Sequence, residues 1–247
     1  MPTAQGEQHP HQRDRYWVSG GSVWRFLLFL GLCGLSSSLL AHGVDDSTKQ
    51  FLLANQGVAV VPYMYIGAKH MVTGYDHLLF LVGVIFFLYR PRDVLLYVTF
   101  FTIGHSVTLL GGVLNNIAVN AYLIDAIIGF SIIYKGFDNL GGFKRVFGRQ
   151  PSTQLAVLIF GLFHGFGLAT KIQEFEIPQE GLVENLISFN IGVEFGQFLA
   201  LSVVFVVLGF WRRHPSFMRF STTANMLLMS AGMMLVGFQM TGYFVNA

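Results

Sequence analysis

Long apolar segments with almost no charge constrain this chain more than any other feature of its sequence. Most of them have close to the roughly 20 residues that an α-helix needs to cross a bilayer. They lie near residues 71–89, 93–113, 118–137, 154–171, 185–210 and 221–244. Only 11% of the 247 residues are charged, whereas a water-soluble domain carries about 25%. The sequence predicts an all-α membrane protein, a bundle of about six transmembrane helices.

The N-terminus has the order of a secretory signal peptide. Three arginines, the last of them Arg25, precede the short apolar run Phe26–Leu35, and small residues follow up to Ala41. This order predicts a cleavable signal peptide over residues 1–41. The alternative is a first helix that stays uncleaved in the membrane. Because the only cysteine, Cys33, lies in this segment, the mature chain is expected to have no thiol ligand.

Residues 42–70 are expected to form an extracytoplasmic segment in front of the helical bundle. The apolar stretch Val58–Gly67 within it is too short for a membrane span and is interrupted by Pro62. This favours an interfacial or re-entrant stretch. The predicted six-helix transmembrane domain then covers residues 71–247.

Positive charge alternates from loop to loop between the predicted spans. The first, third and fifth loops are basic and contain Arg90, Arg92, Lys144, Arg145, Arg149, Arg212, Arg213 and Arg219. The second loop has no charge, and the fourth is acidic. By the positive-inside rule the odd loops face the cytoplasm. We expect a multi-pass protein of the bacterial cytoplasmic (inner) membrane with its mature N- and C-termini in the periplasm.

Ionisable and amide side chains recur inside the predicted spans, where polar groups are costly and usually mark a function. Among the ionisable ones, with His70 just before the first span, are His70, Asp76, His77, His105, Asp125, His164 and Glu194. Since a helix rises about 1.5 Å per residue, the predicted topology puts them in the outer half of the bilayer. Asn190, Glu194 and Gln197 follow at spacings of four and three, which places them in one polar stripe on a helix.

Imidazoles and carboxylates at one depth are suitable ligands for a divalent metal ion such as Ni²⁺, Co²⁺ or Zn²⁺. We expect the metal ligands to be His70, Asp76, His77, His105, His164 and Glu194, with Asp125, Asn190 and Gln197 in support. Taken alone, each residue has a simpler interpretation as a hydrogen-bonding group between helices. The glycines around His164 favour close helix packing, and Gly74 is a candidate helix break between His70 and His77.

Four motifs resemble the HupE/UreJ family of membrane proteins. They are His70-x5-Asp76-His77-Leu-Leu-Phe-Leu, Phe101–Leu109, Gly161–Ala169 and Phe189–Gln197, in that order along the chain. The first is also similar to a signature of nickel/cobalt permeases, with one residue more between His and Asp. The chain resembles the branch of the family that has the Asn-x3-Glu-x2-Gln stripe. The resemblance implies uptake of nickel or cobalt by a secondary transporter.

The leading hypothesis is a divalent-metal permease whose site opens to the periplasm. The alternatives are an intramembrane zinc hydrolase, with Glu194 as general base and Ser106 as hydroxyl, and an accessory protein that handles metal without transporting it. A polar route across the bundle would favour transport, and a dead-end outer cavity would favour hydrolysis. Membrane lipid and a metal ion are the expected partners, and a homo-oligomer is possible. The net charge of +2 gives no reason to expect nucleic acid.

Overall fold

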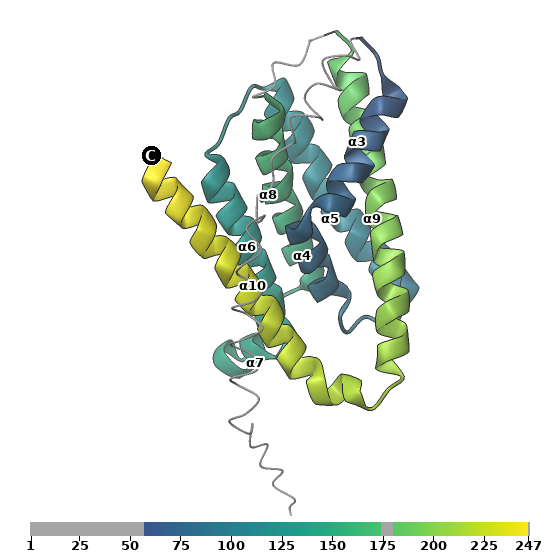
Figure 1. The fold of residues 1–247 in the computed structure, drawn as a ribbon, viewed down its shortest axis with the longest axis vertical. Helices are drawn as coiled ribbons and strands as arrows, with labels where there is room; N and C mark the ends of the chain where they lie inside the picture. Colours follow the sequence, from purple (N-terminus) through teal and green to yellow (C-terminus); the bar gives the residue numbers. More distant parts are fainter. Residues whose placement is uncertain (1–56, 174–179, 247) are drawn as a thin grey trace, which may run out of the picture. The chain divides into compact units, whose positions relative to one another are not determined.

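The described part of the chain is entirely helical in its regular structure. The computed structural model describes residues 57–173 and 180–246, which belong to one compact unit spanning residues 41–247. Figure 1 shows the helices in chain order: α3 (Val60–Thr73), α4 (Tyr75–Ile85), α5 (Pro91–Leu114), α6 (Ala121–Asn139), α7 (Gly142–Phe147), α8 (Thr153–Gln173), α9 (Leu182–Arg212) and α10 (Ser216–Asn246). The all-α prediction is confirmed. The predicted signal peptide lies outside the described residues.

Four of these helices are long and apolar enough to cross a membrane, namely α5, α8, α9 and α10. Helix α4 is apolar but has only 11 residues. Helix α6 has 19 residues and contains Asp125, Lys135 and Asp138. With three charged residues it is not among the helices that are apolar enough to cross a membrane. The chain is a multi-pass membrane protein, and the count of six spans stays a prediction.

The predicted first span, 71–89, is divided at Gly74. Helix α3 begins at Val60, so most of the stretch that was expected to be interfacial or re-entrant belongs to a regular helix. Pro62 is compatible with this helix because it lies in the first turn, where a missing N–H breaks no intrahelical hydrogen bond. Gly74 leaves the helical region with φ −74° and ψ 92°. Helix α4 starts again directly after it and carries Asp76 and His77 in its first turn.

The helices pack in pairs around α4. Helix α3 runs along α9, α5 along α8, and α6 along α10, while α4 contacts α3, α6, α9 and α10. In Figure 1 the short α4 lies between α6 on one side and α9 on the other. Glycines allow the closest approaches: a methyl group on Gly165 of α8 would overlap the carbonyl oxygen of His105 on α5. The glycines around His164 therefore bring α5 and α8 into backbone contact, as the sequence predicts.

Candidate metal centre

His77 is held by its neighbour Asp76 at the start of α4. Its Nδ1 lies 2.7 Å from Oδ1 of Asp76, and its backbone N–H donates to the same oxygen at 2.6 Å. Both side chains are buried. Because a carboxylate can only accept, the imidazole carries its proton on Nδ1 and its lone pair on Nε2. A carboxylate that orients the distal nitrogen of a histidine is a common arrangement behind a metal ligand.

His164 on α8 has the same tautomer for a different reason. Its Nδ1 donates to the carbonyl oxygen of Phe160 at 2.7 Å, so the lone pair again lies on Nε2. The side chain is 1% exposed, and Nε2 has no hydrogen-bond partner within the described residues. A buried acceptor without a partner costs about 1–3 kcal/mol. Such a cost is common at a binding site, where the lone pair is available to a ligand.

Three imidazoles from three helices converge on one small cavity. The ring centroids of His77 and His164 are 4.6 Å apart, and those of His70 and His77 are 5.1 Å apart. The cavity has a volume of about 10 Å³ and is lined by His70, His77, His164, Asp125, Ile128, Gly167, Leu168 and Lys171. A space of roughly 10–15 Å³ holds one water molecule, so the cavity matches a single small ion. The break at Gly74 does not separate the two histidines of the first motif.

A lysine shares this cavity, which the sequence reasoning missed. Lys171 Nζ lies 2.9 Å from Oδ2 and 3.3 Å from Oδ1 of Asp125. The same carboxylate accepts a long hydrogen bond of 3.5 Å from Gln239 on α10. The spacing in the sequence could have identified this lysine, because Lys171 follows His164 by seven residues. It therefore lies on the same face of α8, about two turns away.

His105 is buried but does not line the cavity. Phe101 contacts His105, His77 and His164, with ring centroids 6.2, 6.3 and 4.9 Å apart. The side chain of His105 lies within hydrogen-bonding range of the Asn190 side chain on α9, although neither ring nitrogen has a partner with good hydrogen-bond geometry among the described residues. The ring of Phe101 thus lies between the buried His105 and the histidines that line the cavity.

The polar stripe on α9 is split between the interior and the exposed face. Asn190 and Gln197 are buried, and the Gln197 Oε1 accepts from Thr102 at 3.2 Å. Glu194 is exposed. At about 100° per residue, Glu194 is rotated roughly 40° from Asn190, whereas Gln197 is rotated roughly 20° the other way. That offset takes Glu194 past the edge of the buried face, and neither Glu194 nor Ser106 lines the cavity.

The donors around the cavity suit a transition-metal ion, but they do not form a complete set of metal ligands. Imidazole nitrogens and a carboxylate fit Ni²⁺, Co²⁺ and Zn²⁺. In the part of the chain that the structure describes, no group of three His, Cys, Asp or Glu side chains could hold an ion as it stands. The ammonium group of Lys171 is paired with Asp125 in this cavity, so the carboxylate is not available to an ion. The predicted metal ligands therefore stay a prediction.

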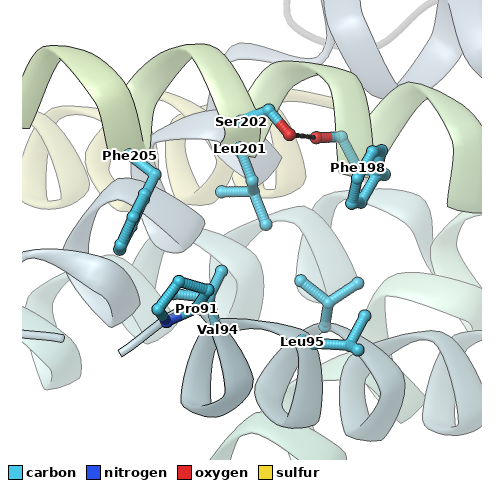
Figure 2. Close-up of a pocket in the computed structure, with 8 residues that line it drawn as sticks. Pro91, Val94, Leu95, Phe198, Leu201, Ser202 and Phe205 are labelled. Atoms are coloured by element: carbon cyan, nitrogen blue, oxygen red, sulfur yellow. Dashed lines mark hydrogen bonds between the residues drawn. The ribbon is translucent and has the colours of Figure 1, made fainter. Parts of the chain in front are cut away.

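A second hollow has a different chemistry. A groove of about 100 Å³ between the first half of α5 and the second half of α9 is lined by Pro91, Val94, Leu95, Val98, Phe198, Leu201, Ser202 and Phe205. Figure 2 shows that its only side-chain hydroxyl, that of Ser202, donates to the carbonyl oxygen of Phe198. This groove offers apolar contacts and no metal ligand.

The comparison with known proteins agrees with the motifs. A family model described as HupE / UreJ protein matches residues 46–247. No curated protein and no solved structure matches the chain. The family match covers all four motifs and every described helix. It also supports a metal-related function in the membrane. The chain belongs to the HupE/UreJ family.

Proposed function

We propose that this protein is a permease for a divalent transition-metal ion of the Ni²⁺ or Co²⁺ type. One observation carries the proposal: a small, ion-sized cavity is lined by the buried His77 and His164 and the half-buried His70, from three different helices. Buried imidazoles are expensive at membrane depth unless they have a task. Family membership supports the same class of function.

In this proposal His77 and His164 are the first ligands of the ion. Both offer Nε2, because Asp76 and the Phe160 carbonyl hold the Nδ1 protons. His70 completes the imidazole set from α3. Asp125 becomes available when its ion pair with Lys171 opens. Imidazole and carboxylate ligands release a divalent ion more readily than thiolates do, which suits transport.

The hydrolase alternative has less support. It assigned the general base to Glu194 and a hydroxyl to Ser106, and neither side chain lines the histidine cavity. Glu194 is exposed on the outer face of α9. An accessory protein that holds metal without moving it uses the same ligands, so only a transport measurement separates it from a permease.

Metal binding is the first test. Purified protein in detergent should bind Co²⁺ or Ni²⁺ by isothermal titration calorimetry, and His77→Ala and His164→Ala should lose this binding. His214→Ala is the matched control, because His214 is exposed and its imidazole bonds locally to Ser216. Equal binding by all four proteins would contradict the proposed site.

Transport is the second test. Proteoliposomes with the wild-type protein should take up Co²⁺ or Ni²⁺, as read by a metal-sensitive dye in the lumen, and the His77→Ala protein should not. Binding without uptake in the wild type would favour the accessory protein over the permease.

A further inference from the structure

A second buried polar cluster lies at the end of α6 opposite to Asp125. Lys135 Nζ donates to Oδ2 of Asp138 at 2.6 Å, and Gln150 Nε2 donates to Oδ1 of Asp138 at 2.6 Å. Lys135 and Asp138 are 6% and 5% exposed. Asp125 and Asp138 are thirteen residues apart, so about 20 Å of helix separates the two carboxylates.

Asn139, the next residue after Asp138, connects this end of α6 to the end of α4 and to the first third of α10. Asn139 Nδ2 donates to the carbonyl oxygen of Gly83 and to Oδ1 of Asn225, both at 2.8 Å. A methyl group on Gly83 would lie 2.8 Å from Cδ2 of Leu228 and 3.2 Å from Cγ of Lys135, so this glycine makes room for both side chains. We call Lys135, Asp138, Asn139, Gln150 and Asn225 the inner polar cluster.

Helix α4 connects this cluster to the histidine cavity. His77 is in its first turn, and Gly83 follows six residues later, about 9 Å along the helix axis. Helix α4 is one half of a segment broken at Gly74. Broken helices with polar groups at their ends form the ion sites of many secondary transporters.

A layer of aromatic rings separates the two polar regions. Phe80 lies 5.9 Å from His164 and 5.5 Å from Phe160, and Phe160 lies 5.3 Å from Tyr134, between ring centroids. Tyr134 directly precedes Lys135 in α6. The rings are therefore in contact from the histidine cavity to the edge of the inner polar cluster, and an ion would cross this layer only if the rings move.

Stability alone gives a weak reason to keep a charged pair at this place. Apolar residues of similar volume usually replace a buried ion pair without loss of stability, because two charges must leave water to form the pair. Ionisable residues inside a membrane domain mark ion or proton routes more often than structure. The hydrogen bond from Gln150 connects Asp138 to the surface, because Gln150 is exposed. Gln150 follows the basic helix α7.

We propose that the inner polar cluster is a second, release-side site for the divalent ion, where Asp138 takes up the ion while Lys135 moves off the carboxylate. This inference rests on the proposed permease function. The ligand that this site offers is the Asp138 carboxylate, and the adjacent Asn139 holds two further oxygens of the cluster, the Gly83 carbonyl and the Asn225 amide oxygen. Oxygen ligands hold Ni²⁺ and Co²⁺ less tightly than imidazoles do, so the ion passes from a tighter to a looser site and is then released.

The test separates binding from transport in the full-length protein. Asp138→Asn and the charge-free double variant Lys135→Met/Asp138→Leu should bind Co²⁺ in detergent within twofold of the wild-type affinity. Their initial uptake rates in proteoliposomes should fall at least tenfold. Lys144→Met is the matched control, since it removes an exposed lysine from the neighbouring α7, and it should keep the wild-type rate.

Three outcomes would overturn the inference. A double variant that transports Co²⁺ at the wild-type rate would show that the ion pair has no part in transport. Loss of Co²⁺ binding together with uptake in both variants would show that the pair only holds the helices together. A wild-type protein that binds Co²⁺ but shows no uptake would overturn the permease proposal itself, and the release-side site with it.

Discussion

The Lys171 ammonium group lies 2.9 Å from a carboxylate oxygen of Asp125, inside the cavity that three histidines line. The two side chains are 14% and 9% exposed, so water screens this charge less than it would at the surface. A positive charge at this position opposes a second cation in the same cavity. If the cavity binds a metal ion as proposed, Lys171 competes with that ion for Asp125 and lowers the affinity of the site, which suits a transporter that must release its ion.

The variant Lys171→Met tests this competition. Methionine keeps most of the length of the side chain and removes the ammonium group, so Asp125 becomes free to bind the ion. We expect Co²⁺ to bind about tenfold more tightly than in the wild type, a change of about 1.4 kcal/mol. Isothermal titration calorimetry in detergent measures it directly.

A double variant provides the control for Lys171. In Lys171→Met/Asp125→Asn the carboxylate is gone as well, so the gain in affinity should disappear. Lys144→Met removes an exposed lysine elsewhere and should leave the affinity unchanged. An affinity of Lys171→Met equal to or weaker than that of the wild type would show that the lysine supports the site instead of competing with the ion.

Asp76 is predicted to act through His77. Asp76→Asn keeps the shape of the side chain but weakens the hydrogen bond that fixes Nδ1 of His77. Loss of such an orienting group costs about 10–100-fold in metal affinity, and we expect a loss of that size for Co²⁺. Asp93→Asn is the matched control, because Asp93 also lies in the first turn of a helix, α5, away from the cavity. Equal affinity in the two variants would contradict this role.

Glu194 is predicted to have no direct part in metal binding. It was expected as a ligand from its position in the polar stripe, but the side chain is exposed and does not line the cavity. Glu194→Gln should keep the Co²⁺ affinity of the wild type within twofold, whereas His164→Ala should abolish binding. A clear loss in Glu194→Gln would mean that α9 rotates to bring the carboxylate inward when the ion binds.

Sequence reasoning could predict the class of fold and the members of the cavity, because both depend on local patterns. Charge-poor segments of span length predict membrane helices, and the histidine motifs identify His70, His77 and His164. The depth argument was less specific, because it grouped His77 and His164 with His105 and Glu194, which do not line the cavity. The break at Gly74 was anticipated only as an alternative, since an isolated glycine inside a helical pattern is tolerated at a modest cost in stability.

The remaining features depend on tertiary packing. Whether Glu194 is buried follows from where α9 meets its neighbours, and a rotation of about 40° decides it. The partner of Asp125 was hidden because Lys171 lies at the end of a predicted span and was counted as a loop charge. Lys135 and Asp138 were overlooked for a similar reason. The Lys135–Asp138 pair adds buried charge at the end of α6 that the list of polar residues in the predicted spans did not include.

The contact between α5 and α8 is predicted to depend on Gly165. A methyl group there would overlap the His105 carbonyl oxygen and the Thr108 hydroxyl. Overpacking of this kind costs about 1–3 kcal/mol, so Gly165→Ala should lower the free energy of unfolding in detergent by that amount. It should also weaken Co²⁺ binding, because it displaces the turn of α8 that carries His164.

Gly111→Ala is the matched control: Gly111 lies in α5 with no atom within 4 Å of an added methyl group, and alanine favours a helix over glycine by about 1 kcal/mol. Its stability should stay the same or rise. Equal stability of the Gly165→Ala and wild-type proteins would show that α5 and α8 are not in backbone contact beside the histidines.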